Sequence, residues 1–386
     1  MSSSNYDVLV AGGSVAGLLT ARELASRGIS VVVVEEHHEI GTPEHCGGMV
    51  SAQGLNKLGI MPDSNVFQNF VTKTIIMSPS SRFELNSEHQ KVVVIDRRAF
   101  DKQIAHQAQR SGAVIRTGCT FRSTGNDGAK GFVAKTTDGD ISCQYFVDAR
   151  GIASLASTGR ENFLPSAQFE IYASWIKDDL VQVAFDSDLY PGFFAWIIPT
   201  GDGIGKVGVA GKGINVSTAL KHFIESRGEK YSTIRKIFAP IWIGGAIDSF
   251  VTGKTIVVGD AAGQTKPSTA GGIYSCGMAG ILAGRAIAES INLNEDLKLK
   301  VYEQEWRNLF QNEFRKMTMA RKVLERLDNK ALDEIINSLT EPNLREIINS
   351  TDFDYHSNIL SMILGSGVGV KMTRTLLGNE FRKIFS

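Results

Sequence analysis

The first 36 residues constrain the fold of this chain more than any other segment. An apolar run at residues 6–11 leads into Gly12-Gly13-Ser14-Val15-Ala16-Gly17, and apolar residues with helical spacing follow as far as Gly28. Residues 29–34 are mostly β-branched and end at Glu35-Glu36, which is typical of a strand buried on both faces of a parallel sheet. The segment therefore predicts a strand, a helix and a second strand parallel to the first.

The small-residue turn of this segment fits a phosphate-binding role. Gly12-x-Ser14-x-x-Gly17 lets a pyrophosphate approach the backbone at the positive end of the helix dipole. Ser14 stands where a second glycine is usual, so either its φ tolerates a side chain or its hydroxyl contacts a phosphate. Glu35 lies 18 residues after Gly17, where a carboxylate accepts hydrogen bonds from a ribose. A tight turn without a ligand is the alternative for a single fingerprint.

A second small-residue turn lies far along the chain. Gly259-Asp260-Ala261-Ala262-Gly263 follows a predicted buried strand at residues 255–258, and Gly271-Gly272 opens a helix that runs to about Ile291. Asp260 is suited to bind a ribityl hydroxyl, and the helix dipole can stabilise the negative edge of a flavin ring. Two such sites some 240 residues apart fit one long ligand, FAD, better than they fit NAD.

The remaining patterns complete an α/β fold class. They predict a strand at residues 92–95 before a helix capped by Asp96, a hairpin within residues 132–147, and further strands between residues 168 and 211. The expected architecture is an FAD-binding Rossmann-like parallel sheet domain, an inserted and mainly antiparallel β-sheet substrate domain, and a C-terminal helical region. We expect the FAD-binding domain to comprise residues 1–70, 96–160 and 250–292. The substrate domain is expected at residues 71–95 and 161–249, and the helical region at residues 293–386.

Composition excludes several classes of function. Lys and Arg number 41 against 41 Asp and Glu, so no basic field is present for nucleic acid. No apolar run approaches the roughly 20 residues that span a bilayer, and no signal peptide is evident, so we expect a cytoplasmic protein. The four cysteines lack a C-x-x-C pair and are interpreted as free thiols. His37, His38 and His45 lack regular ligand spacing, so no metal is expected.

Further motifs resemble a known group of proteins. Together with both turns, Asp96-Arg97-Arg98-Ala99-Phe100-Asp101 and Asp148-Ala149-Arg150-Gly151 resemble flavoproteins of the p-hydroxybenzoate hydroxylase fold, over roughly residues 5–290. Cys46-Gly47-Gly48 and Phe194-x-Trp196-x-x-Pro199-x-Gly201 are similar to motifs of the archaeal geranylgeranyl reductases of the digeranylgeranylglycerophospholipid reductase type. That family saturates isoprenoid chains of membrane lipids, so the resemblance implies an FAD-dependent reductase of phospholipid biosynthesis that acts on CH–CH groups.

The resemblance also implies particular site residues. Its FAD contacts fall on Ala16 at the pyrophosphate turn, Glu35 on the ribose, Cys46, Gly47 and Met49 near the isoalloxazine, Arg97, Phe121 near the adenine, Asp260, Gly272 and Ile273. Cys46 is the candidate catalytic group, which would donate or position a proton beside the alkene. Phe194, Trp196 and Pro199 would line the substrate chain. For Cys46 and the aromatic residues the alternative is ordinary core packing.

Several alternatives stay open from the sequence. A flavin-dependent aromatic monooxygenase shares the fold, and a halogenase shares the Trp196-x-Ile198-Pro199 segment, although its first tryptophan is Phe194 here. A non-enzymatic prenyl-chain escort protein is the third alternative. The electron donor is either reduced nicotinamide or a ferredoxin-like protein. The apolar and basic residues between 360 and 383 favour either packing on the protein or peripheral contact with an anionic membrane surface.

Overall fold

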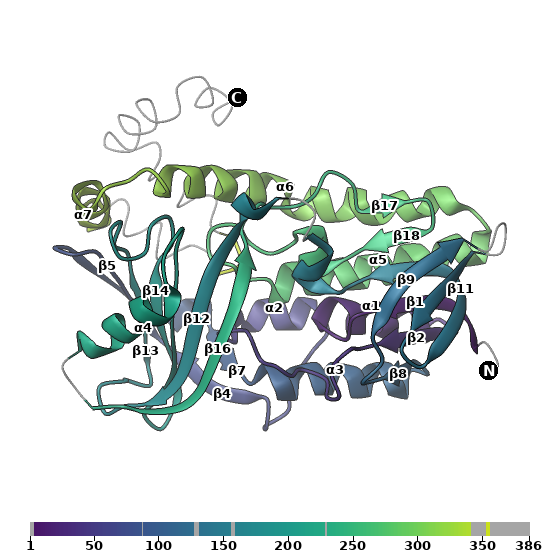
Figure 1. Ribbon diagram of the computed structural model, residues 1–386, viewed down its shortest axis with the longest axis horizontal. Helices are drawn as coiled ribbons and strands as arrows, with labels where there is room; N and C mark the ends of the chain where they lie inside the picture. The colour runs from purple at the N-terminus through teal and green to yellow at the C-terminus, as the bar shows by residue number, and fades with distance from the viewer. Residues whose placement is uncertain are drawn as a thin grey trace, which may run out of the picture.

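The protein is described from a computed structural model, in which two β-sheets lie at opposite ends of an elongated molecule (Figure 1). The structure describes residues 4–340 and 353–355, apart from 87, 127–130, 156–158 and 228–229. The predicted amphipathic segment at 360–383 lies outside the described residues.

The parallel sheet begins with the strand–helix–strand segment that the sequence predicts. β1 (Ser4–Ala11) pairs in parallel with β2 (Val31–Val34) and with β11 (Gly139–Asp148), and β11 pairs in parallel with β18 (Thr255–Val257). The order of the sheet is β17-β18-β11-β1-β2-β8, with β10 and β9 added antiparallel beside β11. The remaining bounds are β8 (Val114–Arg116), β9 (Phe121–Asn126), β10 (Phe132–Thr136) and β17 (Val251–Thr252).

Two long helices cross closely on one face of this sheet. In α5 (Ile273–Leu293), Gly280 faces the backbone of Ala16 in α1 (Val15–Ala25), and a side chain at Gly280 would overlap the Ala16 carbonyl oxygen. Such contacts exclude any Cβ, because the two backbones approach too closely. α3 (Arg97–Arg110) packs beside α1, and Asp96 caps it by accepting hydrogen bonds from the N–H groups of Arg98 and Ala99 at 2.8 and 3.1 Å. The predicted cap is thus confirmed.

The second large sheet has seven strands in the order β16-β12-β15-β14-β13-β5-β6. It is antiparallel except for the parallel pair of β13 and β5, and α4 (Val216–Glu225) packs on one face. The strand bounds are β5 (Lys73–Met77), β6 (Arg82–Asn86), β12 (Phe163–Tyr172), β13 (Leu180–Ala184), β14 (Ala195–Gly201), β15 (Ile204–Ala210) and β16 (Ser232–Trp242). The α/β fold class with a mainly antiparallel second sheet is confirmed.

Smaller elements join the two sheets. β3 (Met49–Ser51), β7 (Val92–Ile95) and β4 (Phe67–Val71) form a three-stranded sheet, and α2 (Ala52–Lys57) follows β3. Short 3-10 helices span residues 88–90, 151–155, 160–162, 259–262 and 296–298. The long helix α6 (Leu299–Leu324) passes from the parallel sheet towards the seven-stranded sheet, where α7 (Asn329–Ser338) lies (Figure 1). The predicted domain boundaries stay a prediction.

Candidate active site

The first glycine turn has the crowded geometry that a phosphate cradle requires. Gly12 has a φ of +111° and a side chain on it would overlap the Ala149 carbonyl oxygen, while a side chain on Gly17 would overlap the Gly12 carbonyl oxygen. Ser14 has a φ of −95° and is exposed, so a side chain is tolerated at this position of the turn. Glu35 Oε2 accepts a hydrogen bond from the Gly13 N–H at 2.7 Å, which places the carboxylate at the turn.

The second small-residue turn lies against the first. A Cβ built on Gly259 would stand 2.9 Å from that of Ala16, so the two turns converge although the sequence separates them. Exposed Asp260 accepts a hydrogen bond from the Thr265 hydroxyl and another from the Cys276 thiol, at 3.4 Å for the thiol. Gly272 is the N-cap residue of α5, and a Cβ on it would stand 3.5 Å from Asp260 Oδ1. Ile273 follows, buried in the first turn.

Side chains from α6 hold the second turn in place. Gln264 accepts a hydrogen bond from the Gly259 N–H at 2.7 Å and donates one to the Tyr302 hydroxyl at 2.8 Å. Tyr302 donates in turn to the Val257 carbonyl oxygen at 2.8 Å, and Trp306 donates to the Ser275 carbonyl oxygen at 3.1 Å. Gln264 and Trp306 are fully buried and Tyr302 nearly so, so these bonds form away from water. No motif in the sequence predicts these hydrogen bonds.

The helix ends test whether these turns fit a dinucleotide. α1 and α5 begin without a side-chain cap, as does α6, whereas α2, α3, α4 and α7 are capped by the side chains of Ser51, Asp96, Asn215 and Asp328. Uncapped N–H groups at a helix N-terminus attract anionic groups. The residues present therefore fit FAD: the α1 turn would hold its pyrophosphate, Glu35 its ribose, and the Asp260 turn with the α5 N-terminus its flavin half.

The Cys46-Gly47-Gly48 turn lies where the small sheet meets the seven-stranded sheet. Gly48 has a φ of +82°, and its N–H donates a hydrogen bond to the Cys46 sulfur at 3.3 Å. A Cβ on Gly47 would stand only 2.6 Å from Ile198 Cδ1 of β14. Cys46 is half-buried, whereas the other three cysteines are buried. Met49 follows in β3 and packs against the cluster that contains Ile198.

The predicted substrate residues lie on the seven-stranded sheet. Trp196 Nε1 donates a hydrogen bond to Gln168 Oε1 at 3.1 Å, and Gln168 Nε2 donates to the Cys46 carbonyl oxygen at 3.4 Å. Phe194 is buried and its ring centroid lies 6.0 Å from that of Trp196. Pro199 is also buried, and its carbonyl oxygen accepts a hydrogen bond from Asn69 at 3.1 Å. Gln168 therefore links Trp196 to the backbone of Cys46, whereas Pro199, three residues after Trp196 in β14, points to the opposite face of the sheet.

Two arginines lie beside predicted FAD contacts: Arg97 near Cys46, and Arg150 near Phe121 and Gly12. Arg97 forms two hydrogen bonds with Asp101, at 3.0 and 2.9 Å. Burial disfavours its charge, but Asp101 and the Cys46 sulfur outweigh burial, so the pKa of Arg97 is raised. Arg150 lies 4.8 Å above the Phe121 ring and its backbone nitrogen flanks Gly12. Phe121 thus belongs to the edge of the glycine turn, through an arginine that the sequence analysis did not select.

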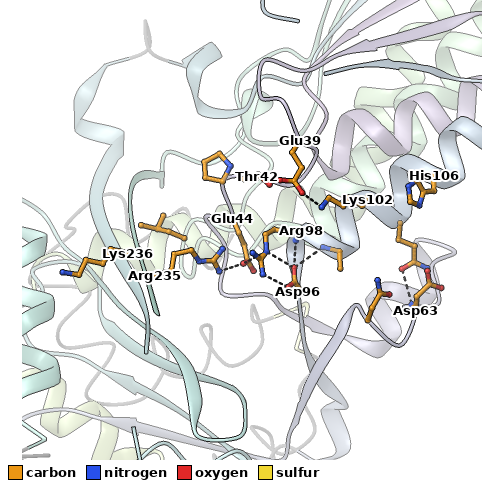
Figure 2. Close-up of a pocket in the computed structure, with 15 residues that line it drawn as sticks. Glu39, Thr42, Glu44, Asp63, Asp96, Arg98, Lys102, His106, Arg235 and Lys236 are labelled. Carbon is orange, nitrogen blue, oxygen red and sulfur yellow. Dashed lines mark hydrogen bonds and ion pairs between the residues drawn. The ribbon is translucent and has the colours of Figure 1, made fainter. Parts of the chain in front are cut away.

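A buried carboxylate beside Cys46 is the largest feature that sequence reasoning missed. Glu44 pairs with Lys206 at 2.6 Å and with Arg235 at 2.5 Å, and Arg98 lies 3.8 Å away. Figure 2 shows Arg235 and Arg98 converging on Glu44 at one side of a cavity of about 570 Å³. Burial disfavours the charged carboxylate, but Lys206 and Arg235 outweigh it, so the pKa of Glu44 is lowered. The only sequence feature that pointed to this ion pair was Lys206, a lysine in the otherwise apolar strand β15.

The described residues offer neither a metal site nor a membrane-spanning helix. No group of three or more His, Cys, Asp and Glu side chains is placed to hold a metal ion among them. His37 instead bonds Glu35 at 2.6 Å through its Nδ1. No described helix is long and apolar enough to cross a membrane.

Comparisons with known proteins agree with this geometry. The uncharacterized protein MJ1520 of Methanocaldococcus jannaschii is 30% identical over 396 residues, covering 98% of this chain and 100% of that protein. Digeranylgeranylglycerophospholipid reductase 2 of Methanothermobacter thermautotrophicus is 29% identical and covers 89% of this chain and 94% of its own. A geranylgeranyl bacteriochlorophyll reductase-like protein of Thermoplasma acidophilum has the same fold, with a TM-score of 0.87 at 23% identity over 97% of this chain and 100% of its own.

The flavin-dependent brominase Bmp2 also shares the fold, with a TM-score of 0.69 at 17% identity, over 98% of this chain and 100% of its own. A family model described as FAD binding domain matches residues 5–230, which is more than half of the chain. The converging turns, the uncapped helices and this match lead to one conclusion. The chain belongs to the family of proteins with this FAD binding domain, and it is a flavoprotein oxidoreductase with FAD as cofactor.

Proposed function

We propose that this protein reduces the double bonds of geranylgeranyl chains, with archaeal membrane ether phospholipids as its substrates. The reductase name of the Methanothermobacter relative supports the substrate class. One observation carries the proposal to this chain: Gln168 links the carbonyl oxygen of Cys46 to the indole of Trp196. The backbone of the half-buried Cys46 is therefore joined to an aromatic residue of the second sheet.

The chemistry of an isolated alkene explains the need for both groups. Such a bond has no carbonyl to stabilise a carbanion, so a proton must arrive together with a hydride. When bound, reduced FAD supplies the hydride. We propose that Cys46 donates or positions the proton, while Trp196 and Phe194 keep water away from the developing positive charge. The Gly48 N–H, which bonds the Cys46 sulfur, would hold the thiol in place during the transfer.

The test is reduction of a defined lipid by the purified, FAD-loaded protein. With a chemical reductant present, we expect digeranylgeranylglycerophospholipid to gain two hydrogen atoms for each double bond saturated, as measured by mass spectrometry. Cys46→Ser should keep its bound flavin and lose turnover, and Cys119→Ser is the matched control, since Cys119 is a buried thiol in the loop between β8 and β9. An unchanged lipid mass would overturn the proposal.

The same preparation separates the remaining alternatives. A monooxygenase or halogenase would consume oxygen when substrate is added, whereas the proposed reductase would not. Comparing reduced nicotinamide with a reduced ferredoxin as the reductant identifies the electron donor. Sedimentation with vesicles of anionic lipid tests the proposed peripheral membrane contact. Each measurement uses the full chain, so the residues outside the described ranges take part.

A further inference from the structure

One face of the seven-stranded sheet collects the polar residues that surround the Cys46 turn. In the strand register, Ile198 pairs with Lys206, and Lys206 pairs on its other side with Glu170. Glu170 pairs in turn with Arg235 of β16. Directly opposed residues point to the same face of a sheet. This face therefore presents a lysine and an arginine towards the turn.

Lys206 has an unusual environment for a lysine. Its side chain and that of Glu44 are each 1% exposed, and their Nζ and Oε1 atoms are 2.6 Å apart. Burying two charges costs free energy that only close pairing offsets, so such a pair is seldom retained for stability alone. A Cβ built on Gly48 would stand 3.3 Å from Lys206 Nζ. The buried cation thus touches the same turn that carries the candidate thiol.

Glu44 joins this lysine to two other parts of the molecule. Its Oε2 atom pairs with Arg235 at 2.5 Å, and Arg235 also pairs with Glu170 at 3.0 Å. Its Oε1 atom accepts a weak hydrogen bond from the Arg97 N–H, at 3.4 Å, at the start of α3. Figure 2 shows Glu44 between Arg235 and Arg98. Because Glu44 is only two residues before Cys46, whatever fixes this carboxylate also fixes the start of the turn.

We propose that Glu44 and Lys206 are positioning residues, which hold the Cys46-Gly47-Gly48 turn on the seven-stranded sheet and thereby set the place of the Cys46 sulfur. The proposal rests on the proposed function in one respect, that Cys46 acts beside the alkene. In this proposal the pair acts through the turn and not on the reacting atoms. Its loss would leave the turn attached through the backbone bond from the Ile95 N–H to the Gly48 carbonyl oxygen, at 2.9 Å, the weaker bond from Gln168 to the Cys46 carbonyl oxygen, at 3.4 Å, and the packing of Ile198 on Gly47.

The test measures the position of the sulfur directly. Iodoacetamide is added to the folded, FAD-loaded protein, and the rate of Cys46 alkylation is followed by peptide mass spectrometry. The other three cysteines are buried and should react slowly. The main variant is the double change Glu44→Gln with Lys206→Met, because it removes both charges and avoids the unpaired buried ion of either single change. Lys206→Met alone is the second variant.

We expect the double variant to alkylate roughly tenfold faster than the unchanged protein, because the turn opens locally. Its kcat for the lipid should fall while KM stays nearly constant. Lys206→Arg keeps the positive charge, so its alkylation rate and its kcat should lie closer to those of the unchanged protein. The matched control is Arg22→Met. Arg22 is a half-buried arginine that bonds Gln107 and the Leu58 carbonyl oxygen, away from the turn. The rate of Cys46 alkylation in Arg22→Met should stay within about twofold of the rate in the unchanged protein.

The outcomes separate the two proposals. Faster alkylation of the double variant supports the positioning role, whether or not any lipid is reduced. An alkylation rate equal to that of the unchanged protein overturns the role, even if the variant loses activity. If the unchanged protein reduces no lipid while alkylation still responds, the proposed function fails and the positioning of the thiol stands.

Discussion

Two turns of this protein are held in place in different ways. The Gly12–Gly17 turn is fixed by close backbone contacts, because the Ala149 carbonyl oxygen lies against Gly12 and the Gly12 carbonyl oxygen lies against Gly17, which leaves no room for a Cβ at either glycine. The Cys46–Gly48 turn is fixed by Ile198 and Lys206, which come from strands more than 150 residues away. The first turn therefore depends on the absence of side chains, and the second depends on particular side chains that are present.

This difference explains which function each turn can serve. A turn of small residues presents backbone N–H groups to any pyrophosphate, so many proteins can share it. A turn held by buried ion pairs can set one side chain against one substrate, because its position follows from several distant residues. The first turn is thus general to FAD proteins, whereas the second is expected to distinguish this enzyme from others of the same fold.

The largest effect should follow from breaking the first turn. Gly12→Ala adds a Cβ where the Ala149 carbonyl oxygen already lies, so we expect purified protein without bound flavin, as measured by the visible flavin absorbance relative to protein absorbance. The matched control is Gly112→Ala. Gly112 has a φ of +108°, close to the +111° of Gly12, but no atom lies within 4 Å of its Cβ position. Flavin retained by Gly12→Ala at the level of Gly112→Ala would contradict the role of crowding.

The second prediction concerns the charge that holds the other turn. The folded state lowers the pKa of Glu44 below its ordinary 4.5, so its ionised form stabilises the fold above that pH. The stabilisation is lost as the pH falls through the lowered value. Glu44→Gln should therefore unfold at lower urea concentration at pH 7, with a loss of about 3 kcal/mol, and the difference should shrink at pH values below 4.5.

The control for this pH dependence is Glu225→Gln. Glu225 forms an exposed pair with Lys221 at 3.7 Å, so its removal should change the unfolding free energy by less than about 0.5 kcal/mol at every pH. A difference for Glu44→Gln that stays constant from pH 7 down to the acid range would mean that its carboxylate charge does not stabilise the fold.

The contrast between the turns also decides what the sequence could predict. The strand–helix–strand segment, the Asp96 cap and the α5 start at Gly272 follow from local patterns, and the structure confirms them. Local patterns suffice there because the interactions lie within a few residues of one another. The convergence of the Gly12 and Gly259 turns was also predictable, since both motifs were interpreted as parts of one ligand site.

The ion pair of Glu44 and Lys206 was not predictable in this way. The two residues are 162 positions apart, and neither belongs to a motif. A lysine inside β15 is consistent with a solvent-facing position, so its burial depends on how the two sheets meet. The bond between Gln264 and Tyr302 has the same character, because α6 resembles many charged amphipathic helices until its partner is known.

A smaller effect should follow from Tyr302→Phe, which asks whether the FAD turns also need side chains. Removing the hydroxyl leaves the buried Gln264 amide without its acceptor, a loss of about 1–3 kcal/mol. We expect FAD to bind roughly tenfold more weakly, as measured by fluorescence titration of the apoprotein. Tyr190 is a buried tyrosine in the connection between β13 and β14, and Tyr190→Phe should bind FAD normally. Equal affinities in the two variants would show that backbone contacts alone hold the turn.

The smallest effect should come from Gln168→Leu, the link between Cys46 and Trp196. The substitution removes one acceptor for the Trp196 indole N–H and one weak donor to the Cys46 carbonyl oxygen, so KM for the lipid should rise roughly fivefold. Gln182→Leu is the matched control, because Gln182 pairs with Ile197 and so points to the opposite face of the same sheet. FAD affinity should be unchanged in both. A weaker affinity for FAD in Gln168→Leu alone would move Gln168 from the substrate side of the site to the cofactor side.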